Sequence, residues 1–169
     1  DKWIESRFNK LVKEVDENME KYEMGLALHK IYEFTWSEYC DWYLEMIKPR
    51  LYSKNQDDMQ TALYYATNIL DKAMRLLHPF MPFVTEEIFQ NLKPFLTDAE
   101  ESIMIASWPV YEEDKIDDRK EDLIGHIIDA IKAIRNVRSE MNIAPSKKAP
   151  LFVALNKESE KLVDEKNRH

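Results

Sequence analysis

The amino-acid sequence predicts an all-α fold, an antiparallel bundle of helices. Apolar residues recur at intervals of three and four along most of the 169-residue chain, which is the spacing of one helix face. Only two glycines, Gly25 and Gly125, are present, and this scarcity disfavours tight β-turns and glycine-rich phosphate loops. Hydrophobic residues make up 44 % of the chain, which is enough for a folded core.

Prolines and one glycine set most of the expected helix boundaries. Gly25 interrupts the first apolar stripe, and Pro49 and Pro79 end the second and third helices. A capping box of Ser53 and Gln56 is expected to start the third helix, and Pro82 suits the first turn of the fourth. Two helices are expected at about residues 3–22 and 26–47, a third from the Ser53 capping box to Pro79, and two more at about residues 82–93 and 118–141.

Each predicted helix carries an apolar stripe that is expected to face inward. In the second helix these residues are Ile31, Thr35, Tyr39, Trp42 and Met46. The connections are short, so neighbouring helices should pack antiparallel. Because the stripes would close on each other, the chain is expected to be monomeric.

The remaining segments are predicted to be less regular. Residues 98–122 are expected to be irregular, with residues 102–108 as a candidate extended stretch. Near the C-terminus, residues 151–155 have the pattern of a short β-strand, and another helix is expected from Glu158 onward. The predicted organisation is a helical domain over residues 1–148, followed at 149–169 by the start of a small αβ appendage.

Composition and missing motifs exclude several classes of function. The single cysteine, Cys40, excludes an internal disulfide framework and a multi-cysteine zinc site, and it favours a cytoplasmic location. No apolar run approaches the roughly 20 residues that a membrane helix needs. No phosphate-loop, dinucleotide-binding or zinc-protease motif is present. We therefore expect no catalytic residue, no metal ligand set and no cofactor site in this chain.

The formal charge of −8 is distributed unevenly. Residues 98–122 hold ten acids and three bases, which accounts for nearly all of the excess. Residues 129–148 hold five bases and two acids. Affinity for a polyanion depends on local charge, so one face can still bind nucleic acid. The candidates in this segment are Lys132, Arg135 and Arg138, for which a solvated helix face with ordinary salt bridges is the alternative.

The second predicted helix is unusually aromatic, with six aromatic residues between Tyr32 and Glu45. Most of them are expected in the core. Phe34 lies beside that stripe and is a candidate to stack on an unpaired base, with burial against another helix as the alternative. Glu38 lies on the apolar face, and a structural hydrogen bond to a tyrosine or an arginine explains it better than acid–base chemistry does.

Four further cations are predicted to meet at one end of the bundle. Arg7 and Lys10 lie in the first helix, and Lys48 and Arg50 lie at the end of the second. If these helices run antiparallel, the start of one lies near the end of the other. The sequence therefore predicts a basic rim that could hold the phosphates of a nucleic acid.

Three segments together resemble one family. They are residues 32–45 (YEFTW and CDWYLE), residues 77–88 (LHP through EEI) and residues 134–145 (IRNVRSEMNIAP). They are similar to the helical anticodon-binding domain of class I aminoacyl-tRNA synthetases of the valine, isoleucine and leucine type. The first and third segments resemble the valyl enzymes, and the second is shared with the isoleucyl enzymes.

The resemblance implies a tRNA-binding role for the candidates above, with the anticodon stem-loop of a valine tRNA as the partner. It also implies a parent enzyme that charges this tRNA with valine, using ATP and Mg in a catalytic domain outside this chain, and a C-terminal coiled coil beyond residue 169. Two alternatives stay open: the same domain of an isoleucyl enzyme, and a helical protein-interaction module that binds no RNA.

Overall fold

The structure is a computed structural model that describes residues 1–97, 99–144, 146–148 and 150. The chain forms two compact units, Asp1–Asp118 and a second one that begins at Arg119. The expected strand at 151–155 and the helix from Glu158 lie outside the described residues.

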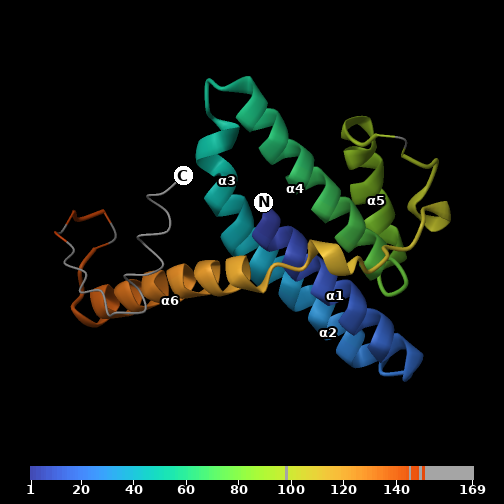
Figure 1. Cartoon of the computed structure of the whole chain (residues 1–169), viewed down its shortest axis with the longest axis horizontal. Coiled ribbons are helices and arrows are strands. Elements are labelled where there is room, and N and C mark those ends of the chain that lie inside the picture. Colours follow the sequence, from blue (N-terminus) through green and yellow to red (C-terminus); the bar gives the residue numbers. More distant parts are fainter. Residues whose placement is uncertain (98, 145, 149, 151–169) are drawn as a thin grey trace. The chain divides into compact units, whose positions relative to one another are not determined.

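The fold is all-α, as the sequence predicts, and the described residues contain no strand. Figure 1 shows the helices in chain order. The main elements are α1 (Lys2–Glu20), α2 (Met24–Glu33), a π-helix η1 (Phe34–Tyr43), α3 (Leu44–Leu51), α4 (Gln56–Leu77), α5 (Pro82–Leu92) and α6 (Asp118–Glu140). Short 3₁₀ turns follow at η2 (Lys93–Phe95), η3 (Ile103–Ile105) and η4 (Glu113–Lys115).

The centre of the first unit is an antiparallel pair in which α1 packs along α2 (Figure 1). The apolar stripe of α1 is buried as predicted, and α4 packs across both helices. An ion pair also links the two helices: Lys30 Nζ on α2 lies 2.6 Å from Glu14 Oε2 on α1. The buried core residues of α1 are Trp3, Ile4, Phe8, Leu11, Val12 and Val15.

The break between the first two helices differs from the prediction. It falls at residues 21–23, and Gly25 lies inside α2. Tyr22 adopts a φ of 60°, and Glu23 N donates to Asn18 O at 2.8 Å, which is a left-handed helix cap. Tyr22 thus ends α1, and its side chain is 87 % exposed, although the first helix was expected to extend to residue 22.

The second predicted helix is one continuous rod whose middle section is a π-helix. In a π-helix each N–H bonds five residues back, so every turn holds more residues than an α-turn and the inward face shifts. The buried residues are therefore Ile31, Phe34, Tyr39, Tyr43 and Ile47, while the expected Thr35, Trp42 and Met46 are only partly buried. The rod also continues past Pro49 to Leu51.

Two smaller expectations are also corrected. Asn55, and not Ser53, caps α4: Asn55 Oδ1 accepts hydrogen bonds from Asp57 N at 3.1 Å and Asp58 N at 3.3 Å. The candidate extended stretch at residues 102–108 contains the 3₁₀ turn η3. Glu86 Oε2 on α5 accepts from Ser102 Oγ at 2.7 Å and holds this turn.

The acidic segment after α5 returns along α1 and is fixed by polar contacts. Asn9 donates through Nδ2 to Glu112 O at 2.7 Å and accepts from Glu112 N at 3.0 Å. Ser6 Oγ accepts from Asp117 N, and Trp108 Nε1 donates to Asp16 Oδ1, both at 2.8 Å. The acids of residues 108–117 therefore lie on a segment held against α1, which we call the strap.

A buried ion pair on α4 makes a testable contribution to stability. Asp71 Oδ2 lies 2.8 Å from Arg75 Nη2, and Asp71 Oδ1 has no hydrogen-bond partner in the structure. Burial raises the pKa of the Asp71 carboxyl, although the Arg75 guanidinium opposes the shift. Since the folded-state pKa is above the unfolded one, the stabilising contribution is fully present at low pH and is lost as pH rises through the folded value.

We expect the advantage of the native chain over Asp71→Asn to shrink as pH rises from 3.8, the ordinary value of this carboxyl, toward neutrality. Asparagine is uncharged at every pH and mimics the protonated carboxyl. Urea unfolding of both proteins across this pH range measures the difference. An advantage that grows with pH would show that the Arg75 contact outweighs burial.

The long helix of the second unit is more exposed than predicted. No residue of α6 is buried, and Ile127, Val137 and Met141 on its apolar stripe are exposed. The helix ends in a left-handed cap, with Asn142 at a φ of 51° and Ile143 N donating to Arg138 O at 2.9 Å. The premise that every apolar stripe is covered therefore fails for α6, and the monomeric state stays a prediction.

Candidate nucleic-acid interface

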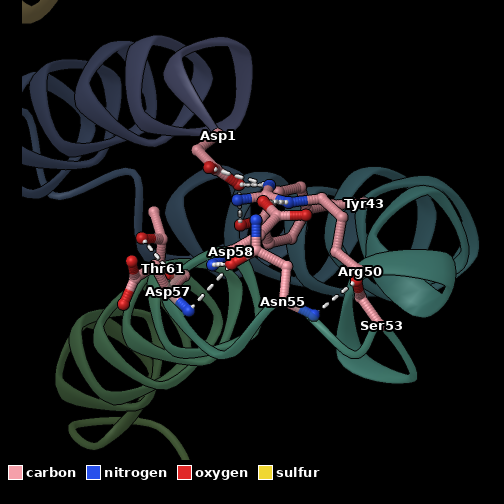
Figure 2. Close-up of polar contacts among 8 residues, drawn as sticks. All are labelled: Asp1, Tyr43, Arg50, Ser53, Asn55, Asp57, Asp58 and Thr61. Atoms are coloured by element: carbon pink, nitrogen blue, oxygen red, sulfur yellow. Dashed lines mark hydrogen bonds and ion pairs between the residues drawn. The ribbon is translucent and has the colours of Figure 1, made fainter.

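Arg50 pairs with two carboxylates at the corner between α3 and α4, which we define as residues 48–58. Its Nη1 lies 2.7 Å from Asp1 Oδ1 and 2.8 Å from Asp1 Oδ2, and its Nε lies 2.6 Å from Asp58 Oδ1 (Figure 2). The guanidinium thus joins the start of α1 and the start of α4 to the end of α3. A planar fork of donors suits such two-sided pairing better than an ammonium does.

Tyrosines beneath the corner anchor it to the core. Tyr43 donates its hydroxyl to Asp1 Oδ1 at 2.9 Å, and Tyr39 donates to Ala66 O on α4 at 2.9 Å. Burial raises the pKa of both phenols above their usual range, so both hydroxyls stay protonated and act as donors at physiological pH. The π-helix therefore supplies the supports of the corner.

Arg7 has a structural partner. Its Nε donates to Glu38 Oε2 and its Nη2 to Glu38 Oε1, both at 2.7 Å, in a bidentate bridge from α1 to the π-helix. The prediction that Glu38 makes a structural hydrogen bond to a tyrosine or an arginine is confirmed. Arg7 stays a candidate phosphate contact only by prediction, since this geometry gives it a role in holding two helices together.

The structure does not gather the four rim cations into one basic surface. Lys10 lies 2.5 Å from Asp118 Oδ1, and with Arg7 it lines a pocket of about 240 Å³. Three cations and three carboxylates line this pocket, so their charges balance. The lining residues include Arg7, Lys10, Lys30, Glu14, Glu33 and Glu38.

Lys48 does not line this pocket; it lies in the last turn of α3, close to the corner. Its ammonium pairs with Glu45 one turn earlier, and both side chains are more than half exposed. An exposed pair of this kind contributes little to stability and opens easily. Lys48 is therefore available to a phosphate at small cost, which distinguishes it from Arg50 and Arg7.

The stacking interpretation of Phe34 is corrected. The ring is only 2 % exposed and packs edge-to-face on Phe8, with centroids 5.6 Å apart. A base cannot reach a ring that is buried between α1 and the π-helix. Phe34 lies three residues after buried Ile31 and seven after buried Ala27, so ordinary α-helical spacing already places it on the inward face. Trp36, by contrast, is 59 % exposed and lies parallel to the ring of Tyr32.

The basic residues of α6 lie near the end of that helix. Arg138 Nη2 donates to Ala144 O and Lys147 O, both at 2.8 Å, and so fastens the segment after the helix. Arg135 and Arg138 line an open groove with Ser139, Asn142, Ile143 and Ala144. Lys132 is exposed on the same helix. These three residues stay candidates, and each also interacts within the protein.

Sequence reasoning found Arg50 but missed its partners Asp1 and Asp58, and it missed Tyr43, which donates to Asp1. Asp1 is 49 residues away from Arg50, and no local pattern connects positions at that separation; only the packing of the helices brings them together. The charge pattern of the corner itself was available, because residues 48–55 hold three cations and no acid.

Two further observations concern the kinds of site. In the part of the chain that the structure describes, no helix combines the length and apolarity needed to cross a bilayer. Among the same residues, no group of three or more histidine, cysteine or carboxylate side chains is placed to hold a metal ion.

Comparisons with known proteins agree with the resemblance. The family model of the anticodon-binding domain of tRNA ligase matches residues 1–153. A valine–tRNA ligase of Clostridium tetani is 44 % identical over 153 residues, covering 90 % of this chain and 17 % of that protein. The enzyme of the same name from Thermotoga maritima is 42 % identical with the same coverage, and that of Laribacter hongkongensis is 42 % identical over 154 residues.

The chain spans about a sixth of the length of these relatives. The matched region covers all the helices described above, including the corner at Arg50 and the basic end of α6. The helical fold and the match over most of its length lead to the same conclusion: this chain belongs to the family of anticodon-binding domains of tRNA ligases.

Proposed function

We propose that this chain is the anticodon stem-loop binding domain of a valine–tRNA ligase. The observation that carries the proposal is the family match over residues 1–153, together with relatives that are named as valine–tRNA ligases. In this proposal the parent protein charges valine tRNA with valine at the expense of ATP. Mg and ATP act in a catalytic domain elsewhere in the parent, and this domain positions the tRNA.

The binding surface that we propose is centred on the α3–α4 corner. Lys48 contacts a phosphate directly, because its pair with Glu45 is exposed and replaceable. Arg50 acts as a positioning residue that fixes the corner through Asp1 and Asp58. Phosphate contacts of this kind orient the RNA without reading its sequence, so the discrimination among tRNAs depends on contacts to the loop bases.

The proposal predicts preferential binding of one RNA hairpin. At low salt the 169-residue chain should bind a valine anticodon stem-loop more tightly than a hairpin with the same stem and a scrambled loop. Fluorescence anisotropy over a salt series measures both affinities, and each phosphate contact contributes a slope of about −0.7 to −0.9 in log affinity against log salt. Equal affinity for the two hairpins would contradict the proposal.

Lys48→Ala should weaken both hairpins to the same extent and reduce the salt slope by about one unit. The matched control is Lys21→Ala, which removes the same charge from an exposed position at the opposite end of α1. This control should leave the affinity and the slope unchanged. If both lysine variants behave alike, the binding is diffuse and the corner is not its centre.

A further inference from the structure

Several aromatic side chains on the described surface are exposed, and their electrostatic surroundings differ. Tyr52 at the corner is 85 % exposed, comparable to Tyr22 at 87 %. Within four residues on either side, Tyr52 has three cations and no acid, whereas Tyr22 has two acids and one cation. Trp36 has two acids nearby, and Phe83 also has two. Arg50 is paired with Asp1 and Asp58, so Lys48 and Lys54 are the accessible cations beside Tyr52, and the other three aromatic residues have no such pair of lysines within four residues.

The backbone that carries Tyr52 is fixed on both sides. Tyr52 N donates to Lys48 O at 3.2 Å and Ser53 N donates to Arg50 O at 3.0 Å, which closes α3. Ser53 Oγ then accepts from Asn55 N at 3.1 Å, immediately before α4 begins (Figure 2). Because the backbone of this corner is already fixed, less backbone entropy is lost when a ligand contacts it.

Two lysines flank Tyr52 in the sequence. Lys48 lies one helical turn before Tyr52 and therefore on the same side of α3. Lys54 lies two residues after it and is exposed, and no side chain in the described part of the chain forms an ion pair with it. Asp57 and Asp58 are the nearby acids on the α4 side; both lie in the first turn of that helix, where the helix dipole offsets negative charge, and Asp58 pairs with Arg50.

We propose that Tyr52 stacks on an unpaired base of an RNA loop, while Lys48 and Lys54 contact the phosphates on either side of that base. An exposed ring between two cations matches the alternation of bases and phosphates in single-stranded RNA. This inference rests on the proposed function and adds to it the residue that holds a loop base. Neither Tyr52 nor Lys54 belongs to the set predicted from sequence.

The test uses the full chain and three RNAs: the valine anticodon hairpin, the same hairpin with 2-aminopurine replacing single loop bases, and a duplex without a loop. Tyr52→Ala should weaken hairpin binding about tenfold and abolish the quenching of 2-aminopurine at one loop position, since stacking causes that quenching. Duplex binding should not change. Tyr52→Phe should behave like the native chain, because stacking requires the ring and not the hydroxyl.

Tyr22→Ala is the matched control: it removes an equally exposed tyrosine from acidic surroundings and should leave hairpin affinity unchanged. Lys54→Gln should reduce the salt slope by about one unit. Circular dichroism should show unchanged melting for the tyrosine variants, so that a loss of binding is not a loss of folding.

The outcomes separate the two proposals. If the native chain does not prefer the valine hairpin over a scrambled loop, the proposed function fails. If the native chain prefers it and Tyr52→Ala binds equally well, the proposed function stands and the stacking inference is wrong. A loss of affinity in Tyr52→Phe as large as that in Tyr52→Ala would also overturn stacking, because the hydroxyl would then be the contact.

Discussion

Replacing Phe34 by alanine is expected to lower the free energy of unfolding by about 3–5 kcal/mol. The ring is buried against Phe8 at the junction of α1 and the π-helix, and no neighbouring side chain can fill the space that it would leave. Urea unfolding followed by circular dichroism measures the loss. At temperatures where the variant is still folded, its affinity for an RNA hairpin should equal that of the native chain.

The matched control for Phe34 is Trp36→Ala, two residues along the same rod. Trp36 is exposed and contacts the ring of Tyr32, so its removal should cost no more than about 1 kcal/mol. A Phe34 variant that keeps its stability but loses RNA affinity would contradict the core assignment and restore the stacking interpretation.

Replacing Arg50 by leucine is expected to destabilise the chain by about 2–3 kcal/mol, because the Asp1 and Asp58 carboxylates both lose their guanidinium partner. The Asp1 side chain is only 14 % exposed, so water can compensate it only in part. Chemical denaturation measures the change. Arg50→Lys should recover less than half of the loss, since an ammonium cannot reproduce the fork that bridges Asp1 and Asp58.

Lys54→Leu provides the comparison for Arg50, because it removes an exposed cation only four residues away. It should change stability by no more than about 0.5 kcal/mol. If both substitutions have similar small effects, the contacts of Arg50 with Asp1 and Asp58 contribute nothing net and the corner is held by the tyrosines alone.

The helices could be predicted from the sequence because apolar spacing and prolines are local signals. Pro82 begins α5 as expected, and α6 begins at Asp118 as expected. The π-helix could not be predicted in this way, since residues 34–43 contain no glycine or proline to mark a change in turn. That irregularity changes the spacing of inward positions after Phe34, so Tyr43 and Ile47 are buried where Trp42 and Met46 were expected.

The candidate site was predicted less well than the fold. The positions of lysine and arginine are known from a sequence. Whether the charge of each is neutralised depends on carboxylates that only the folded structure brings close. Glu38 reaches Arg7 because the π-helix packs on α1, and Asp118 reaches Lys10 because the segment after α5 returns along α1. Arg7 and Lys10 at the pocket are therefore neutralised by carboxylates of the protein, whereas Lys48 and Lys54 stay accessible.

The π-helix also determines the direction in which the corner faces, measured around the axis of the rod formed by α2, the π-helix and α3. Additional residues per turn rotate everything that follows Tyr43 relative to α2, including Arg50 and Tyr52. Deleting one residue from this segment would let it relax toward an ordinary α-turn and would swing the corner away from Asp1, while every helix could still form. The ten residues thus work as an angular spacer, and the direction in which the basic corner faces is encoded by how many residues that spacer contains.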